Sequence, residues 1–434
     1  MQTICLLNDS FPPVIDGVAN AVLNYGENLH ALGDDPIVVT PEYPGADDGG
    51  YPFPVLRYPA LDLRSMTAGY MAGVPFAPEV MRQLTEHKPA LLHSHCPIVS
   101  IMLGREFRQV LDVPLVMTYH TKFDVDIANL IHSKVLQESS KRALVENINA
   151  CDEVWAVSRG AAENLRSLGY EGECVIMQNG VDLPRGRVSK ALVQEVTSGL
   201  DLPGNVPVFL FVGRIMWYKG LRIILDAMAA LKAGGKDFRM VFVGGGGDFE
   251  AVKSYSESLN LQDKCFFPGP EADREKLRAW YCRANLFLFP STFDTNGLVV
   301  REAAACGLGA VLIGGSCAAE GVTDGRNGLL IEENAESMAA CLQKLDIPAM
   351  TVIGQHAQQE LYISWETAVG IARERYEVVI DRYRSGGYPT HHHGLDSVFK
   401  VNGELMEGLC RLEERRDALH KKFTDKVHEM KHIL

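Results

Sequence analysis

Short apolar runs recur along the first half of the chain, and stretches with helical spacing separate them. Apolar runs bounded by turn residues predict buried strands, here at 3–7, 37–40, 90–95, 114–120 and 153–158. Apolar residues three and four positions apart predict helices at about 18–32 and 134–151. Strands that alternate with helices in this way indicate a parallel sheet with helices on both faces.

The same alternation restarts after a polar segment, 184–207, which is broken by glycine and proline and predicts an inter-domain segment. Strands are predicted at 208–212, 239–243, 265–267, 286–289, 309–313 and 328–331. The chain is therefore expected to be α/β, with two doubly wound Rossmann-like domains facing across a cleft. The expected divisions are a first domain at 1–190, a second at 191–365, a helix at 366–385 that crosses back to the first, and a charged helical tail at 386–434.

The tail helix expected at 402–434 carries apolar residues near a seven-residue repeat, interrupted by Arg416. Three alternatives stay open for it: packing on the body of the protein, a hairpin, or pairing between subunits. Packing is favoured, and self-association through 402–434 remains an alternative.

Composition narrows the class of protein. The 434 residues carry a formal net charge of −13, which argues against a nucleic-acid partner. No apolar run approaches the roughly 20 residues that span a bilayer. The ten cysteines lack C-x-x-C spacing and there is no secretory signal pattern, so a cytoplasmic protein with reduced thiols is expected. Peripheral attachment at the inner membrane surface stays open.

The stretch 286–307 organises the candidate chemistry. A buried strand ends at Pro290, a polar loop follows, and Asn296 is expected to cap the next helix. A helix N-terminus presents N–H groups and a positive dipole end to phosphate. Asp294 and Glu302 flank that helix end, and carboxylates beside a diphosphate suit the hydroxyl groups of a nucleotide sugar. An ordinary strand-to-helix turn is the alternative.

Other candidate residues follow predicted strands. Arg214 and Lys219 come after 208–212 and suit a diphosphate leaving group, although two surface charges are the alternative. Gly17 precedes the first helix and permits close approach of a ligand. His95 and His120 each end a strand and are expected to point into the cleft.

Two further motifs are set aside. Glycines 244–247 lack both G-x-G-x-x-G and P-loop spacing, so neither a dinucleotide site nor a P-loop is predicted. The triple histidine 391–393 lacks spaced cysteine or acidic partners, and no metal site is predicted there.

Together these segments resemble glycosyltransferase family 4, a retaining family with the GT-B fold. The resemblance covers about residues 4–384, and the tail lies outside it. It is carried by the order of PPVIDGVANAV, LLHSHCP, PLVMTYHT, DEVWAVS, QNGVD, VGRIMWYKG, VGGGG, PST, GLVVREAAACG and TDGRNGLLI.

The resemblance implies a role for each matching residue. Arg214 and Lys219 would bind the donor diphosphate and neutralise its charge in the reaction. N–H groups near Gly297, Leu298 and Val299 would assist them, with Asn296 in the same loop.

The two acids and the first domain would complete the site. Glu302 would take the ribose hydroxyls, and Asp294 would contact the donor sugar. Gly17 would lie near the phosphates and His120 near the sugar and the acceptor. Lys122 and Asp124 are expected to contact the acceptor.

The resemblance also implies retention of configuration, a UDP-sugar as co-substrate, no cofactor and no bound metal. Asp294 is one methylene shorter than the usual glutamate, and Asp16 replaces a usual glycine. TYHT followed by KFD, TNGL, and Trp365 with Glu366 look most like bacterial diacylglycerol glucosyltransferases.

A hexose, expected to be glucose, would therefore move from a UDP-sugar to a lipid such as diacylglycerol. The lipid is suggested by loops 51–66 and 121–130, where apolar residues such as Tyr58 and Phe123 alternate with Arg57, Arg64 and Lys122. Transfer to a soluble sugar, polysaccharide or small molecule is the alternative. A nucleotide-sugar 2-epimerase and a non-catalytic nucleotide-sugar-binding protein are alternatives of another class.

Overall fold

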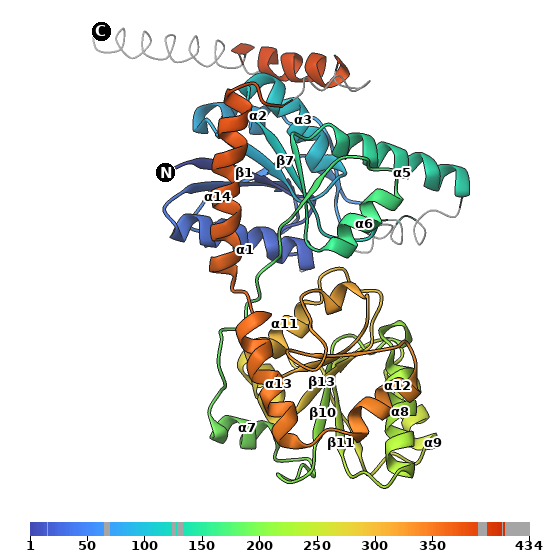
Figure 1. The fold of residues 1–434 in the computed structure, drawn as a ribbon. Coiled ribbons are helices and arrows are strands. Elements are labelled where there is room, and N and C mark those ends of the chain that lie inside the picture. The colour runs from blue at the N-terminus through green and yellow to red at the C-terminus, as the bar shows by residue number, and fades with distance from the viewer. Residues whose placement is uncertain are drawn as a thin grey trace, which may run out of the picture. The chain divides into compact units, whose positions relative to one another are not determined.

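The computed structural model describes residues 1–14, 16–64, 70–123, 127, 133–388, 397–409 and 411–412. The chain forms two compact units. The first unit comprises 1–157, 161–177 and the chain from 369 onward, and the second comprises 158–160 and 178–368. Each unit contains one parallel sheet with helices on both faces, so the predicted α/β architecture with two Rossmann-like domains is confirmed (Figure 1).

The sheet of the first unit has seven parallel strands in the order β3-β2-β1-β6-β7-β8-β9. Their bounds are β1 Thr3–Leu7, β2 Asp35–Pro41, β3 Val55–Tyr58, β6 Leu91–Ser94, β7 Leu115–Tyr119, β8 Glu153–Ala156 and β9 Cys174–Ile176. A short antiparallel pair, β4 (Ala60–Leu61) and β5 (Ala72–Gly73), stands apart from it. The strand order reverses between β1 and β6, which makes that point the crevice of the first sheet.

Helices cover both faces of the first sheet. One face packs against α2 (Pro78–His87), α3 (Val99–Leu111), α5 (Lys134–Asn149) and α6 (Arg159–Ser167) in a single apolar core. The other face holds α1 (Gly17–Ala31) and the part of α14 (Trp365–Arg384) that belongs to this unit. Tyr376 of α14 stacks on Trp155 of β8, and Arg375 pairs with Glu153 at 2.6 Å. These contacts fix α14 on the first sheet.

The sheet of the second unit has six parallel strands in the order β12-β11-β10-β13-β14-β15. Their bounds are β10 Val208–Val212, β11 Arg239–Val243, β12 Cys265–Gly269, β13 Leu286–Phe289, β14 Ala310–Ile313 and β15 Leu329–Ile331. This is the Rossmann order, which reverses between β10 and β13. The predicted strands of this half are thus confirmed, with ends that shift by one or two residues.

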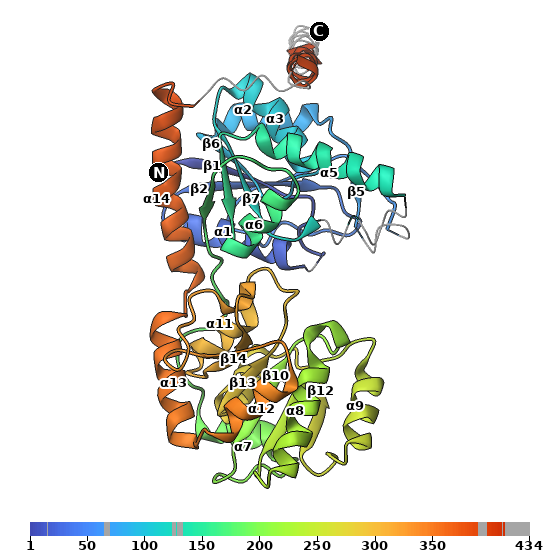
Figure 2. The ribbon, with the colours of Figure 1, turned by 45° about the vertical axis from the view of Figure 1, so that its right-hand side comes forward.

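Two sets of helices sandwich the second sheet (Figure 2). One set is α8 (Leu221–Ala233), α9 (Phe249–Ser258) and α12 (Ala335–Gln343). The other is α7 (Lys190–Thr197), α10 (Arg274–Arg283), α11 (Leu298–Ala305) and α13 (Ile347–Glu360). Two short 3-10 turns, η1 (Trp217–Lys219) and η2 (Cys317–Ala319), lie in loops of this unit.

The segment 184–207, which was predicted to link the domains, belongs to the second unit. Within 184–207 the chain forms α7, whose first turn Ser189 caps by accepting the Leu192 N–H. The second unit already begins at Gln178, before the expected boundary at 191. The physical reason is that Trp365 Nε1 donates to Asp182 Oδ1 at 2.8 Å, which ties 178–183 to the second unit.

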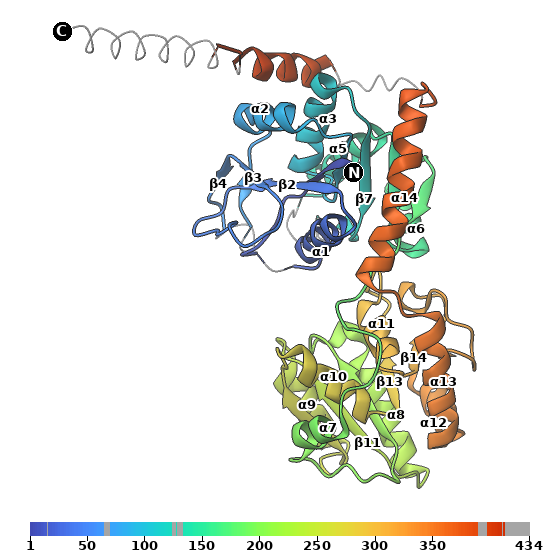
Figure 3. The same ribbon diagram turned by 90° about the vertical axis from the view of Figure 1, so that its left-hand side faces the viewer.

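Part of the expected tail is described, as a helix over 397–409. It packs on the first unit, with Phe399 and Met406 buried and Asn402 donating to Glu106 Oε1. Figure 3 shows this helix beside α2 and α3. The packing alternative therefore holds for 397–409, whereas 413–434 and the histidines 391–393 lie outside the described residues.

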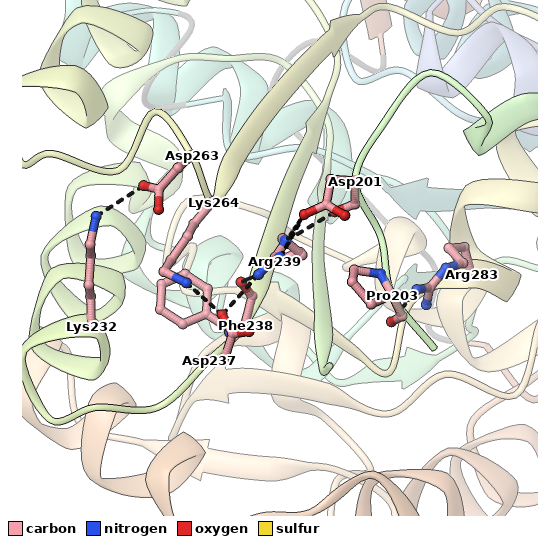
Figure 4. Close-up of polar contacts among 9 residues, drawn as sticks. All are labelled: Asp201, Pro203, Lys232, Asp237, Phe238, Arg239, Asp263, Lys264 and Arg283. Atoms are coloured by element: carbon pink, nitrogen blue, oxygen red, sulfur yellow. Dashed lines mark hydrogen bonds and ion pairs between the residues drawn. The ribbon is translucent and has the colours of Figure 1, made fainter. Parts of the chain in front are cut away.

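Ion pairs gather where strands of the second sheet begin, at the edge opposite their carboxyl ends (Figure 4). Arg239, the first residue of β11, pairs with Asp201 at 2.6 Å and with Asp237 at 2.9 Å. Lys264 pairs with Asp237 at 2.5 Å and lies over the Phe238 ring. This network joins the starts of β11 and β12 at the base of the sheet.

Two of the four glycines after β11, Gly244 and Gly246, pack too closely against the backbone to admit a side chain. A Cβ on Gly244, which has φ +151°, would lie 1.9 Å from the Gly213 carbonyl oxygen, whereas a Cβ on Gly245 would meet ordinary contacts at 3.8 Å. We expect Gly244→Ala to lower the free energy of unfolding by about 2–4 kcal/mol. Gly245→Ala is the control and should change it little. Equal urea midpoints for the two variants would contradict this prediction.

Candidate active site

The candidate residues of the second unit meet where its strand order reverses. Lys219 ends η1, after β10, and Asp294 lies in the loop after β13, the neighbouring strand. Lys219 Nζ donates to both carboxylate oxygens of Asp294, at 2.7 and 2.8 Å, and Ser291 Oγ donates to Oδ2 at 2.6 Å. Ligands of open α/β sheets bind at this kind of switch point, beyond the carboxyl ends of the strands.

Lys219 is held by its surroundings as well as by its partner. Its side chain is 9% exposed, and the rings of Tyr218, Phe289 and Phe293 lie within 6 Å of Nζ. Gly220 follows with φ +77°, and a Cβ there would lie 2.1 Å from the Pro290 carbonyl oxygen. A buried ammonium in a fixed position is suited to neutralise a second negative charge.

The N-terminus of α11 opens into the same loop. Gly297 adopts φ +58°, and a Cβ there would lie 2.8 Å from Ala318 Cα. No described residue accepts a hydrogen bond from the N–H groups of Leu298 and Val299. Unpaired N–H groups at a helix start are the usual anchor for phosphate.

Asn296 does not cap α11, so that expectation was wrong. Gly297 occupies the cap position with a left-handed backbone, and no side chain among the described residues caps the helix by a hydrogen bond. The carboxamide is buried, with Asn296 only 9% exposed, and neither of its polar atoms has a partner among the described residues. A buried amide without partners costs about 1–3 kcal/mol, which a bound polar ligand would recover.

Glu302 lies one turn into α11, with both carboxylate oxygens engaged. Arg274 Nη2 donates to Oε1 at 2.9 Å, and Tyr281 OH donates to Oε2 at 3.0 Å. Sequence reasoning missed both donors. Their spacing of seven was the available signal, because in a helix it places both residues on one face.

Arg214 and Gly17 are both exposed, in different units. Among the described residues, Arg214 has no hydrogen-bond or ion-pair partner. Gly17 starts α1, and its neighbour Asp16 caps that helix by accepting the N–H groups of Val18 and Ala19 at 2.7 and 2.8 Å. Asp16, which replaces the glycine usual at this position, thus places a carboxylate at the N-terminus of α1.

His95 and His120 follow β6 and β7 as predicted, and both side chains are buried. His95 Nδ1 and His120 Nε2 lie 2.9 Å apart, and the His93 ring lies 4.0 Å from that of His95. Burial lowers the pKa of His120 to about 3 and that of His95 well below its usual value. Both are therefore neutral at physiological pH.

These buried imidazoles predict a pH-dependent stability. The pKa of His120 is lower in the folded than in the unfolded chain, so the unfolded chain binds more protons between about pH 3 and 6.5. We expect the stability of the first unit to fall as pH drops through that window. His120→Asn should reduce the slope by about 1.4 kcal/mol per pH unit, measured by urea unfolding. His30→Asn, at an exposed site, is the control. An unchanged slope for His120→Asn would contradict the prediction.

The residues expected to bind the acceptor are only partly as predicted. Lys122 lies just after β7 with intermediate exposure, and Asp124 lies outside the described residues. Tyr58 is fully buried, and Arg57 pairs with Asp48 at 2.7 Å. Neither is available to an acceptor, because β3 places both in the packed body of the first unit. Leu61, Leu63 and Tyr70 are exposed.

Among the described residues, no helix is long and apolar enough to cross a membrane. No group of three or more histidine, cysteine or acidic side chains there is arranged to hold a metal ion.

Two family models match the chain. Glycosyltransferase Family 4 matches residues 15–185, and glycosyl transferases group 1 matches residues 194–346. The first match falls almost entirely in the first unit and the second in the second unit.

Individual relatives agree with the models. A GDP-mannose-dependent alpha-mannosyltransferase of Corynebacterium glutamicum is 27% identical over 338 residues, which are 76% of each chain. An alpha-monoglucosyldiacylglycerol synthase of Acholeplasma laidlawii is 24% identical over 344 residues, 77% of this chain and 85% of that protein.

A solved structure gives the same fold. The Anabaena protein Alr3699/HepE, crystallised with UDP, superposes with a TM-score of 0.66 at 20% identity, over 87% of this chain and 100% of that one. The resemblance found in the motifs is thereby confirmed. The chain belongs to the family 4 glycosyltransferases, and its fold is of the GT-B type.

Proposed function

We propose that this glycosyltransferase moves a hexose, glucose in the first instance, from a UDP-sugar to a lipid such as diacylglycerol, with retention of configuration. The observation that carries the donor half is the buried Asn296 carboxamide. Within the described part of the chain neither it nor the N–H groups of Leu298 and Val299, which start α11, has a hydrogen-bond partner. Both lie in the loop whose Asp294 contacts Lys219. Polar groups with unmet hydrogen bonds around a fixed cation suit a diphosphate and its sugar.

The proposed transfer requires neutralisation of the negative charge on the leaving diphosphate. As the bond from the anomeric carbon to phosphate breaks, negative charge grows on the diphosphate. Lys219 and Arg214 would stabilise that charge, together with the N–H groups of Leu298 and Val299. The departing phosphate oxygen would take the proton of the acceptor hydroxyl on the same face of the sugar. This route uses no enzyme nucleophile and keeps the anomeric configuration.

With two cations and a helix N-terminus assigned to the diphosphate, transfer should need no divalent ion and no cofactor. We expect the rate to persist after exhaustive chelation with EDTA. The measurement is product formation by chromatography, with heat-inactivated protein as the blank. A rate that vanishes and returns on adding magnesium or manganese would contradict the metal-independent route.

A lipid acceptor is supported by two facts. Leu61, Leu63 and Tyr70 are exposed in the first unit, and apolar side chains of this kind favour a lipid surface. One relative is named an alpha-monoglucosyldiacylglycerol synthase, that is, an enzyme whose product is a glucosylated diacylglycerol. A soluble acceptor is the second candidate, because Arg57 and Arg64 are already paired with Asp48 and Asp62 and leave less positive charge for an anionic membrane.

The deciding experiment offers radiolabelled UDP-glucose with water, soluble sugars, and vesicles with and without diacylglycerol. UDP-galactose and GDP-mannose replace UDP-glucose in parallel. Label in chloroform-extractable α-glucosyl product supports the proposal. Label only in water-soluble acceptors replaces the lipid with the second candidate. Conversion of the donor into its 2-epimer, or binding without any turnover, would overturn the proposal in favour of an epimerase or a non-catalytic protein.

A further inference from the structure

Helix α10 presents two side chains to Glu302, the residue to which the proposed function gives the ribose hydroxyls. Tyr281 OH lies 3.0 Å from Oε2 and Arg274 Nη2 lies 2.9 Å from Oε1. Tyr281 is fully buried, whereas the Arg274 side chain is 47% exposed. One donor thus approaches Glu302 from the core and the other from the rim of the site.

The contacts of Tyr281 and Arg274 keep the first neutral and the second charged. Burial, together with the charge of Glu302, raises the pKa of Tyr281 well above its usual value, so the phenol remains a neutral donor. Burial alone lowers the pKa of Arg274, but the charge and hydrogen bond of Glu302 raise it overall. Arg274 also lies 3.6 Å from Asp182, whose other oxygen accepts from Trp365 Nε1. The guanidinium is therefore held between two carboxylates.

An ionised carboxylate offers about four lone-pair sites, two on each oxygen. Tyr281 takes one on Oε2 and Arg274 takes one on Oε1, which leaves one on each oxygen. Two neighbouring hydroxyl groups can donate to such a pair of sites, one to each oxygen. The cis-diol of a ribose has this arrangement.

We propose that Tyr281 and Arg274 are positioning residues, which hold the Glu302 carboxylate in the orientation that receives the two ribose hydroxyls of the donor. This rests on the proposed function, which places the ribose at Glu302. Neither residue needs to touch the donor. Their effect is on binding, because the ribose is remote from the bond that breaks.

The first test is Tyr281→Phe, which removes one oxygen atom and keeps the ring in its place. We expect KM for the UDP-sugar to rise about tenfold while kcat stays within about twofold, because binding lost equally from ground and transition states raises KM alone. Arg274→Gln should act in the same direction. Tyr255→Phe is the matched control, since its hydroxyl donates to Asp226 at 2.6 Å elsewhere in the same unit.

A second measurement separates positioning from mere structural support. UDP, 2′-deoxy-UDP and 3′-deoxy-UDP are tested as competitive inhibitors of each variant. The ratio of their inhibition constants gives the loss of affinity caused by each missing hydroxyl. In the native protein each deletion should weaken binding, and in Tyr281→Phe the same deletions should weaken it much less. Thermal unfolding of all variants is recorded alongside, because loss of packing would lower the melting temperature without changing the discrimination between UDP and its deoxy analogues.

The outcomes distinguish the two proposals. If Glu302→Gln abolishes the discrimination but Tyr281→Phe and Arg274→Gln retain it in full, the positioning inference is wrong and the donor site stands. If Glu302→Gln itself discriminates between UDP and its deoxy analogues as the native protein does, the ribose is not at Glu302 and the proposed donor site fails. Reduced discrimination in Tyr281→Phe, with native behaviour in Tyr255→Phe, supports positioning.

Discussion

Replacing Lys219 by alanine is expected to lower kcat/KM for sugar transfer about 10²- to 10³-fold, or about 2.7–4 kcal/mol of transition-state stabilisation. The reason is that the Lys219 ammonium is preorganised at the switch point between β10 and β13, bonded to Asp294 and enclosed by three aromatic rings. Charge that appears on the leaving diphosphate would meet a cation already in place. The measurement is steady-state transfer from UDP-glucose, together with calorimetric titration of UDP.

Lys264→Ala is the matched control for this variant. Lys264 is also largely buried, is ion-paired with an aspartate and lies over an aromatic ring, but it stands at the opposite edge of the same sheet (Figure 4). Both variants lose a comparable ion pair, so both should lose some stability, and only Lys219→Ala should lose UDP affinity. Equal UDP affinities in the two variants would remove Lys219 from the donor site.

Arg214 is exposed and lacks a partner among the described residues, so Arg214→Ala should keep the native stability while lowering turnover tenfold or more. The measurement pairs a thermal melt with the transfer assay. Turnover equal to that of the native protein would show that Arg214 is an ordinary surface charge.

The strands of both sheets could be predicted from the sequence because each is a buried apolar run with turn residues at its ends. Runs 208–212, 239–243 and 286–289 match β10, β11 and β13 to the residue. The edge strands β3 and β9 escaped prediction because they are short and only partly buried, so that their apolar pattern is weak. Helix α7 was not predicted, because the glycines and prolines of segment 184–207 are typical of a linker.

Of the candidate site, the sequence could predict only which residues follow the carboxyl ends of neighbouring strands. Placing Lys219 and Asp294 after neighbouring strands follows from the Rossmann order, but their direct contact depends on the turn at Gly220, which needs a positive φ. The donors to Glu302 come from α10, which lies before β13 in the chain. Their spacing of seven places them on one helix face, but nothing in the sequence relates that face to Glu302. The strand-end positions of His95 and His120 could be predicted, but the depth of their burial could not, because it depends on side chains from other elements that pack around them.

Asp294→Asn is expected to tighten the binding of UDP, on the order of tenfold, while lowering transfer about 10²-fold or more. In the native protein Asp294 competes with an incoming anion for Lys219, since Lys219 Nζ lies 2.7 and 2.8 Å from the two carboxylate oxygens. Asparagine removes that competition, and it also removes a negative charge near the diphosphate. At an effective dielectric constant of about 20, a charge about 6 Å away contributes on the order of 2–3 kcal/mol before screening.

Transfer should nevertheless fall, because the carboxylate assigned to the donor sugar is lost. The two measurements therefore move in opposite directions, which general misfolding cannot produce. Asp294→Glu is the companion variant: it keeps the charge, restores the side chain usual in the family, and should bind UDP as the native protein does. Its transfer from UDP-glucose and from UDP-galactose then reports whether the missing methylene sets the choice of sugar. Weaker UDP binding by Asp294→Asn would mean that Asp294 supports Lys219 instead of competing with the diphosphate for it, and the assignment of Asp294 to the donor sugar would be lost.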